Sequence, residues 1–537
     1  MPVRRRHVLV APLAAALGAA CSRRDLDAIA GGFTGTHPER GHLLRAPWPD
    51  RAPDVTRRVH TVIAGGGIAG LAAARALRGA GHEDFALLEL EDGAGGNSRA
   101  MQLAGIACPL GAQYLPLPGD DASAVQDLLE ELGLRRRVAG RWQYDERHLC
   151  HSPQERLFFN GQWQDGLLPV QDVGAATLAQ YRRFAQAVRA AQQAAHYAIP
   201  VQKSSFAPVQ LAQDAITFEA WLNQHGLDDA RLRWYLDYCC RDDYGAGVGG
   251  VSAWAGIHYF ASRHGFHAPG EGGDGDDAGP LTWPEGNGWL AQRLAAPLGD
   301  RLHAARVVGH IVQGRHGVTV DALDAASGRL ERWQAQRAIV ALPVWLAARV
   351  LEPVPDAVRQ RAAGLRTAPW LVANLRLRAP LADRPGAAPS WDNVLYGAPG
   401  LGYVDATHQS LAPVPGPTVL TYYRALGDAP DGRALLLDRP WTHWRDAILA
   451  ELGAAHPDLA AKTELIEITR YGHAMAVPAP GTLGQVQALH RPAGQSADGA
   501  LVFADAPRLA FAHADWSGYS VFEEAFTLGH AAGAAWA

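Results

Sequence analysis

Lysine is nearly absent from this chain, which carries only Lys203 and Lys462, whereas arginine is abundant. The net charge is −5 and no basic cluster follows the first residues, so binding to nucleic acid is not expected. Cysteine is scarce, with five in 537 residues, and its spacing matches no metal-binding motif, so we expect no metal site. Beyond the N-terminus no apolar run reaches the roughly 18 residues of a transmembrane helix, so we expect a soluble body.

The N-terminus resembles a bacterial export signal. Arg4-Arg5-Arg6 precedes a short apolar stretch, in a pattern similar to a twin-arginine signal. The segment Leu17–Cys21 resembles a lipoprotein processing site, although a plain cleavable signal is the alternative. We therefore expect residues 1–21 to direct export to the periplasm, with membrane attachment if Cys21 is lipidated. Residues 22–57 are polar and rich in Arg, Pro and Gly, which is typical of a linker and lead-in segment.

A glycine-rich turn follows the first strongly apolar run of the body. Residues 59–64 predict a buried strand, and Gly65, Gly67 and Gly70 then fit the pattern G-x-G-x-x-G. Gly65 permits a tight turn, Gly67 lets a pyrophosphate approach the backbone, and Gly70 lets the next helix pack close to the strand. An alanine-rich helix is expected over residues 68–77. This order predicts a dinucleotide-binding unit.

The start of that helix and the next strand complete the predicted nucleotide site. Ile68 and Ala69 lie in the first helical turn, where free N–H groups and the positive end of the dipole attract a pyrophosphate. A second apolar run over residues 85–88 ends at Glu89, about 20 residues after the glycine turn. A carboxylate there can accept both ribose hydroxyls of an adenosine, although this pattern alone does not separate NAD from FAD.

A Gly-Gly doublet follows Glu89 at a short distance, and a Gly-Ala-x-Tyr segment comes after it. This order resembles the flavin-containing amine oxidase superfamily, in which both segments run along the pyrophosphate, ribityl chain and flavin of FAD. The resemblance implies FAD contacts from nine residues: Gly95, Gly96, Asn97, Ser98, Arg99, Gly111, Ala112, Gln113 and Tyr114. The arginine that usually follows the doublet in the family is Asn97 here, so Arg99 is the candidate replacement cation.

The C-terminal block resembles the same family. Residues 501–506 are similar to the family strand whose acid lies on the ribityl chain, which assigns that role to Asp505. A Trp-Ser-Gly-Tyr segment then precedes a helix expected over residues 521–535. In the family this segment lies beside the flavin, and the helix N-terminus stabilises the negative charge of reduced flavin. The resemblance therefore implies cofactor contacts from Gly518 and Tyr519.

The middle of the chain also fits this resemblance. Residues 281–289 resemble the family's turn into a helix, and in the strand that follows, the resemblance places Val308 under the adenine. We therefore expect an α/β fold whose Rossmann-like FAD-binding domain is discontinuous, with an α+β substrate domain inserted between its segments. The expected FAD-binding segments are 58–119, 280–345 and 470–537, and the expected substrate-domain segments are 120–279 and 346–469.

Substrates in this superfamily lie over the flavin, within a cage of aromatic side chains. Tyr519 matches one wall of that cage, and Trp516 lies shortly before it. The partner side chain comes from the preceding segment, where Tyr471 and His473 are both candidates. The catalytic-pocket candidates are therefore Tyr519, Trp516 and His473.

Two departures from the family pattern bear on cofactor and acceptor. The C-terminal block has no cysteine, so we expect FAD to be held without a covalent bond. The strand expected over residues 370–375 lacks the lysine that many members place near flavin N5, which is linked to oxygen reactivity. A quinone or a protein of the cell envelope is therefore an alternative to O2 as the electron acceptor.

Three functional hypotheses follow from the sequence. The first is an exported FAD-dependent oxidoreductase that oxidises an amine at its C–N bond by hydride transfer to flavin N5. The second is a C–C desaturase or protoporphyrinogen-oxidase-like enzyme, because one fold supports several reactions. The third is a flavin-binding lipoprotein without redox turnover.

Overall fold

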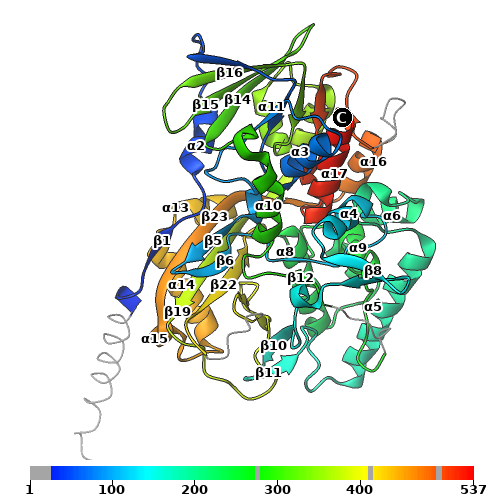
Figure 1. Ribbon diagram of the computed structural model, residues 1–537. Coiled ribbons are helices and arrows are strands. Elements are labelled where there is room, and N and C mark those ends of the chain that lie inside the picture. The colour runs from blue at the N-terminus through cyan, green and yellow to red at the C-terminus, as the bar shows by residue number, and fades with distance from the viewer. Residues whose placement is uncertain (1–25, 272–278, 409–414, 491–498) are drawn as a thin grey trace, which may run out of the picture.

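The computed structural model describes residues 26–271, 279–408, 415–490 and 499–537. Cys21 and the expected signal at residues 1–21 lie outside these ranges. The chain forms three large sheets, which Figure 1 shows with the helices that cover them. No helix within the described ranges is long and apolar enough to cross a membrane.

A six-stranded sheet carries the expected dinucleotide-binding unit. Its strands, in spatial order, are β13 (Leu302–His303), β4 (Phe85–Leu88), β3 (Thr61–Ala64), β17 (Arg337–Val340), β25 (Leu509–Phe511) and β24 (Leu501–Val502). The pairs from β13 to β25 are parallel, and only the edge strand β24 is antiparallel. The four residues of β3 and the four of β4 are all buried, as is typical of a parallel sheet covered on both faces.

Two helices, α3 (Ile68–Gly79) and α17 (Phe522–Ala534), pack tightly together on one side of this sheet, as Figure 1 shows. Glycine at the contact makes this approach possible. A Cβ atom on Gly529 would lie 2.1 Å from the carbonyl oxygen of Ala69, and one on Gly533 would lie 2.4 Å from that of Ala73. The N-terminal and C-terminal segments of the nucleotide-binding domain are therefore held together by direct packing of α3 on α17.

A five-stranded sheet packs against the other face of the six-stranded sheet through a shared apolar core. Its order is β18 (Leu351–Glu352), β14 (Arg306–Gln313), β15 (Val318–Asp324), β16 (Leu330–Ala335) and β2 (Val55–Arg58). Trp333 and Val308 of this sheet share that core with Val62 and Leu88 of the other. This packing places β14 beside Glu89, because the N–H of Arg306 donates to the carbonyl of Glu89 at 2.7 Å.

The substrate domain is built on an eight-stranded mixed sheet. Its order is β1 (Ala30–Phe33), β23 (Thr463–Val477), β19 (Arg366–Leu377), β22 (Thr418–Ala425), β21 (Tyr403–Asp405), β20 (Asp392–Leu395), β10 (Glu155–Phe159) and β11 (Gln162–Asp165). Side chains alternate between its faces. Trp370 and Val372 share one core with α5 (Ala175–Ala194), α8 (Ala230–Tyr244) and α9 (Ala253–Ala261). Leu371 and Ala373 share another core with α14 (Trp441–Gly453).

Shorter elements connect these layers. The remaining helices are α2 (Pro38–His42), α4 (Ser123–Glu131), α6 (Pro208–Asp214), α7 (Phe218–Gln224), α10 (Gly288–Ala295), α11 (Val344–Val350), α12 (Asp356–Gly364), α13 (Gly432–Asp438), α15 (Leu459–Lys462) and α16 (Thr482–His490). The remaining strands are β5 (Ala100–Leu103), β6 (Ile106–Pro109), β7 (Tyr114–Leu115), β8 (Arg135–Val138), β9 (Arg141–Tyr144) and β12 (Leu281–Thr282). Short 3-10 turns are η1 (Leu43–Arg45), η2 (Gly96–Ser98), η3 (Glu146–His148), η4 (Val201–Lys203), η5 (Ala296–Arg301) and η6 (Ala514–Trp516).

The expected fold class is confirmed, whereas the segment boundaries differ from the sequence expectation. The helices α11 and α12 share the core of the nucleotide-binding domain, so the second substrate segment starts at β19 rather than at residue 346. It ends with β23 at Val477, beyond the expected residue 469. The lead-in segment is also structured, because β1 pairs with β23 and β2 pairs with β16 as edge strands.

Candidate functional site

A cavity of about 440 Å³ lies where the nucleotide-binding and substrate domains meet. One end, called here the nucleotide end, is lined by Gly65 to Ala69, Glu89, Arg306 and Val308. The other end, called the substrate end, is lined by side chains of both domains: Asp242, Asp243, Arg263, Trp370, Val372, Tyr423, Tyr471, His473 and Glu523. The segments Gly95–Ser98 and Gly111–Tyr114 also line the cavity. One continuous space therefore touches most of the residues expected from the sequence.

The glycine turn at the nucleotide end leaves room for a phosphate group. Gly65 has φ +103°, which favours glycine, and a Cβ atom on Gly70 would lie 1.9 Å from the carbonyl oxygen of Gly65. A Cβ atom on Gly67 would meet no atom within 4 Å, because this residue faces the cavity. The turn leads into the first N–H groups of α3, which supply donors to an anion. This geometry fits the pyrophosphate of a dinucleotide.

Glu89 lies at the end of β4, next to this turn, and is 7% exposed. Its carboxylate accepts the N–H of Gly66 and the N–H of Glu91, each at 2.8 Å. Burial raises the pKa of Glu89, and these two donors oppose that shift. Val308 lines the same end of the cavity. The structure thus brings together the acid and the apolar surface that an adenosine requires.

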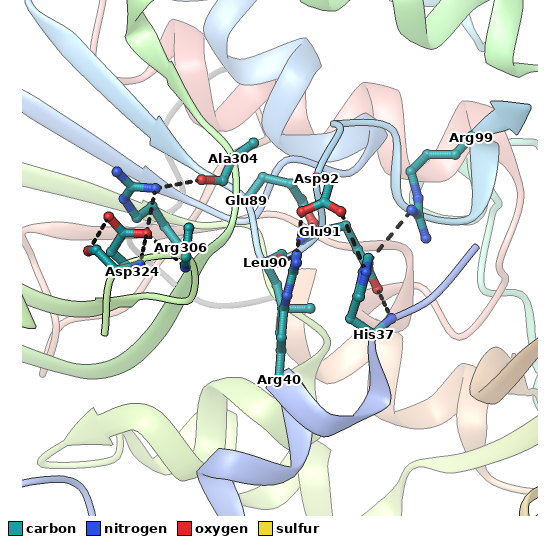
Figure 2. A network of polar contacts seen from close by, with 12 residues as sticks. His37, Arg40, Glu89, Leu90, Glu91, Asp92, Arg99, Ala304, Arg306 and Asp324 are labelled. Carbon is teal, nitrogen blue, oxygen red and sulfur yellow. Dashed lines mark hydrogen bonds and ion pairs between the residues drawn. The ribbon is translucent and has the colours of Figure 1, made fainter. Parts of the chain in front are cut away.

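Figure 2 shows a polar network beside Glu89 that the sequence did not predict. His37 Nδ1 lies 2.6 Å from Glu91 Oε2, and Arg99 lies 3.8 Å from the same oxygen. Arg40 pairs with Asp92 at 2.8 Å, so the lead-in segment is fastened to the loop after β4. Glu91 therefore neutralises Arg99 within the network.

Neither residue after the Gly-Gly doublet provides a cation to the cavity. The side-chain amide of Asn97 donates to the carbonyl of Ala474 at 2.8 Å. Arg99 donates from Nε to the carbonyl of Gly96 at 3.1 Å and does not line the cavity. The expected replacement of the missing arginine by Arg99 therefore needs correction, because this side chain turns toward Glu91.

Tyrosines of the substrate sheet anchor the segment that includes Gly111 to Tyr114. The hydroxyl of Tyr423 donates to the carbonyl of Gly111, and that of Tyr471 donates to the carbonyl of Leu110, each at 2.9 Å. A Cβ atom on Gly111 would lie 2.1 Å from the carbonyl oxygen of Asn97, so the two expected cofactor segments touch through glycine. These bonds hold the cavity wall in place where the nucleotide end joins the substrate end.

Asp505 does not reach the cavity. It is exposed, and its carboxylate accepts the N–H of Asp356 at 3.1 Å. The strand that enters the parallel sheet is β25, which is followed by His513 and Ala514 in the cavity wall. The Leu-x-Phe-Ala pattern occurs twice, at 501 and again at 509, and only the second copy leads directly into the Trp-Ser-Gly-Tyr segment. The position of the second copy, directly before the Trp-Ser-Gly-Tyr segment, could have identified from the sequence which copy forms the strand of the parallel sheet.

Tyr519 and Trp516 are buried behind the cavity wall, each 1% exposed, and neither lines the cavity. The hydroxyl of Tyr519 donates to Asp243 at 2.6 Å and accepts from Arg263. Trp516 packs against Phe503 and Phe511 in the core. Gly518 has φ +73° and packs against Thr482. These residues therefore support the wall, and the expected placement of both aromatic rings in the pocket needs correction.

The two candidates for the partner side chain both line the cavity. His473 stacks on Trp345 with ring centroids 4.3 Å apart, and its Nδ1 lies 2.9 Å from the hydroxyl of Thr367. Burial lowers the pKa of His473 to about 4, so its imidazole is neutral near pH 7. Tyr471 presents its ring to the cavity while its hydroxyl is held by Leu110.

The carboxylates of the substrate end were not predicted from the sequence. Asp243 forms an ion pair with Arg263 at 3.1 Å. Asp242, the preceding residue on α8, has no hydrogen-bond or ion-pair partner among the described residues, and burial with the nearby charge of Asp243 raises its pKa to about 7. Glu523, at the start of α17, is 3% exposed, and burial raises its pKa to about 7. An Asp-Asp pair within the aromatic helix 230–244 was the available signal.

Comparison with known proteins agrees with this geometry. Residues 68–535 match the family of flavin containing amine oxidoreductases. No curated protein matches the chain. Similar solved structures include wild-type putrescine oxidase bound to putrescine, with 18% identity, a TM-score of 0.66 and coverage of 89% of this chain and 99% of that one. Cyclohexylamine oxidase from Brevibacterium oxydans IH-35A has 19% identity, a TM-score of 0.61 and coverage of 89% and 98%. A fatty acid isomerase from P. acnes has 15% identity, a TM-score of 0.57 and coverage of 88% and 97%.

The family match covers most of the chain and all of the residues that line the cavity except Leu44 and Gly65 to Gly67. The glycine turn, the open space at Gly67 and the carboxylate of Glu89 fit the dinucleotide part of the family's flavin cofactor. The chain therefore belongs to the flavin-containing amine oxidoreductases and is an FAD-dependent oxidoreductase.

Proposed function

We propose that this protein oxidises an amine at its C–N bond. The observation that carries the proposal is the continuity of one cavity, which joins a dinucleotide cradle to a substrate end lined by aromatic rings and carboxylates. Aromatic faces and carboxylates both attract alkylammonium groups. A purely apolar substrate would leave Asp242 and Glu523 without a partner, which is costly for buried charge.

The residues of this chain position the amine rather than act as strong acids or bases. Bound FAD supplies the acceptor that takes a hydride from the substrate carbon. Tyr423 and Tyr471 hold the backbone of the adjoining segment through their hydroxyls, so their rings serve as fixed walls. Neutral His473 accepts or donates a hydrogen bond without repelling the ammonium form of the substrate. The imine product then hydrolyses in water.

We further propose that FAD is bound without a covalent bond and that the flavin is reoxidised by a quinone or a protein of the cell envelope, with O2 as the slower acceptor. No cysteine and no lysine occur among the described residues that line the cavity. Trp370 and Val372 are the side chains that β19 presents there. Export and lipidation at Cys21 are proposed from residues 1–21 alone.

A second candidate function is oxidation or isomerisation at a C–C bond. The withdrawal of Tyr519 and Trp516 from the cavity favours it, because the aromatic cage expected from the sequence is not built by these residues. The unpaired carboxylates at the substrate end argue against it. The amine reaction is therefore the better supported of the two.

The test is an anaerobic spectrum of the purified body from Arg23 onward. Monoamines, diamines and aromatic amines are added before air is admitted. Bleaching of the flavin band by an amine supports C–N oxidation, and slow recolouring in air supports an acceptor other than O2. A bound flavin that is reduced by an apolar donor, and by no amine, would transfer the assignment to the C–C reaction.

A further inference from the structure

The lead-in segment crosses from the substrate domain to the nucleotide-binding domain within a few residues, as Figure 1 shows between β1 and α2. The N–H of Thr34 donates to the carbonyl of Ile468 on β23 at 2.9 Å. Shortly after it, the N–H of His37 donates to the carboxylate of Glu91 at 3.1 Å. Residues 34–48, called here the strap, therefore join the two domains whose junction forms the cavity.

Charged side chains hold the strap on the loop after β4. Arg40, on α2, donates to the carbonyl of Leu90 at 3.0 Å and forms an ion pair with Asp92 at 2.8 Å, as Figure 2 shows. This loop directly follows Glu89, the acid that fits the ribose of an adenosine. The strap thus lies beside the nucleotide end of the cavity.

Leu44 brings the strap into the cavity wall itself. It follows Arg40 by one helical turn in the segment formed by α2 and η1, so the two side chains point to the same side. Leu44 is 6% exposed, lines the cavity, and shares an apolar core with Val308 and Leu342, which also line it. The guanidinium of Arg349 on α11 donates to the carbonyl of Leu44 and holds the end of this helical segment. Leu44 therefore supplies apolar surface to the nucleotide end.

Trp48 anchors the far end of the strap on β14. A Cβ atom on Gly309 would lie 1.7 Å from the indole ring of Trp48, so the ring rests on the strand where this glycine leaves room. Gly309 directly follows Val308, the residue expected under the adenine. Trp48 also packs against the apolar core that contains Leu44. The strap is therefore attached on both sides of Leu44.

We propose that the strap is part of the cofactor site, that Leu44 contacts the adenosine half of FAD, and that the strap slows the dissociation of FAD. The family match begins at residue 68 and assigns no role to this segment. Because Leu44 shares one apolar core with the cavity wall, loss of FAD is coupled to detachment of the strap. The proposal concerns the cofactor and does not depend on which substrate is oxidised.

The first test follows the rise of flavin fluorescence as FAD leaves the diluted holoenzyme. Leu44→Ala and Leu43→Ala remove the same atoms from neighbouring residues, but Leu44 is 6% exposed and Leu43 is 47% exposed. We expect dissociation to be at least about tenfold faster in Leu44→Ala, because a buried contact is lost. We expect the rate in Leu43→Ala to stay within about twofold of the natural rate. Equal rates in the two variants would overturn the proposal.

The choice of ligand separates contact with adenosine from a general loss of structure. ADP carries the adenosine half of FAD without the flavin, whereas FMN carries the flavin without the adenosine. We expect Leu44→Ala to lower the affinity of the apoprotein for ADP and for FAD by a similar factor and to leave the affinity for FMN unchanged. Equal weakening of all three ligands would give Leu44 a structural role only and would overturn its assignment as a cofactor contact.

The attachment of the strap is tested at a residue outside the cavity wall. Arg40→Gln removes the ion pair with Asp92, although Arg40 does not line the cavity. We expect FAD to dissociate about threefold faster or more, because the strap detaches more often. Arg51→Gln, which removes an ion pair with Asp54 beyond the strap, is the charge-matched control and leaves the rate unchanged. An unchanged rate in Arg40→Gln would mean that detachment of the strap does not limit release.

A further measurement uses the natural chain without substitution. Hydrogen exchange of backbone amides is compared between the apoprotein and the apoprotein saturated with ADP. We expect ADP to slow exchange in residues 37–48 and to leave it unchanged in the hairpin Arg135–Tyr144, none of whose residues lines the cavity. No added protection in residues 37–48 would overturn the proposal. None of these tests uses an amine, so their failure would leave the proposed amine oxidation in place.

Discussion

The two ends of the cavity are built in different ways. At the nucleotide end, backbone groups and glycines define the shape: Gly65 turns the chain, Gly67 leaves open space, and the N–H of Gly66 holds Glu89. At the substrate end, side chains from α8, β19, β22 and α17 converge from distant parts of the chain. The first construction is local in sequence and the second is not.

The two ends also differ in whether their carboxylates have partners within the protein. At the nucleotide end the carboxylate of Glu89 accepts two N–H donors at 2.8 Å, so it has hydrogen-bond partners before any ligand binds. At the substrate end Asp242 and Glu523 remain without ion-pair partners among the described residues. The nucleotide end is thus preorganised, whereas the substrate end gains stability when a cation binds.

The largest expected effect concerns the nucleotide end. Gly67→Val places two methyl groups in the open space where a pyrophosphate approaches, without a clash against protein atoms. We expect the affinity for FAD to fall by about 100-fold while the protein still folds. Gly79→Val, in the last turn of the same helix, also enters open space, but outside the cavity, and is the matched control. Fluorescence titration of apoprotein with FAD measures both, and unchanged affinity in Gly67→Val would place the cofactor elsewhere.

The next effect concerns the wall behind the substrate end. Tyr519→Phe removes the hydroxyl that joins Asp243 and Arg263, so we expect a loss of about 1–2 kcal/mol in the free energy of unfolding. We expect the KM for an amine to stay nearly unchanged, because Tyr519 does not line the cavity. Urea denaturation and steady-state kinetics measure the two quantities. A large rise in KM with unchanged stability would restore Tyr519 to the pocket and contradict this comparison.

A smaller effect depends on pH. Because the folded pKa of Asp242 is raised to about 7, above its unfolded value, ionisation of this group destabilises the fold as pH rises toward and through 7. We expect Asp242→Asn to increase the free energy of unfolding at pH 8 by on the order of 1 kcal/mol and to have little effect at pH 4. The groups acting on this carboxyl are Asp243, Glu155, Arg263 and Arg241. A destabilised variant at pH 8 would mean that Asp242 already has a partner.

The smallest effect is expected at Asp505. Asp505→Ala leaves the FAD affinity unchanged, because its carboxylate is exposed and bonded to the N–H of Asp356. His513→Ala, which alters a residue in the cavity wall, lowers that affinity by a few-fold. The same FAD titration tests both. A loss of FAD affinity in Asp505→Ala alone would mean that Asp505 contacts the cofactor, as the sequence indicated.

The sequence predicted the nucleotide end because its contacts are close along the chain. Gly65, Gly67 and Glu89 lie within one strand–turn–helix–strand unit, and their spacing alone defines the geometry. The error at Asp505 arose because a similar Leu-x-Phe-Ala pattern occurs twice in the C-terminal block. Only the pairing of β25 with β17 distinguishes the two copies.

The substrate end was harder to predict because no local pattern encodes it. Asp242 of α8 and Glu523 of α17 are 281 positions apart and line the same cavity only because the two domains meet there. Tyr519 follows the family motif in sequence, yet Val521 and Phe522 occupy the cavity wall instead. A motif fixes the order of residues, and tertiary packing decides which of them faces the ligand.

The most direct test of the substrate end is a crystal structure of the dithionite-reduced, FAD-loaded enzyme with a bound alkylamine. We expect the ammonium group to lie beside Asp242 or Glu523, between the rings of Tyr423 and Tyr471. An amine bound outside the cavity at saturating concentration would contradict the proposed amine oxidation.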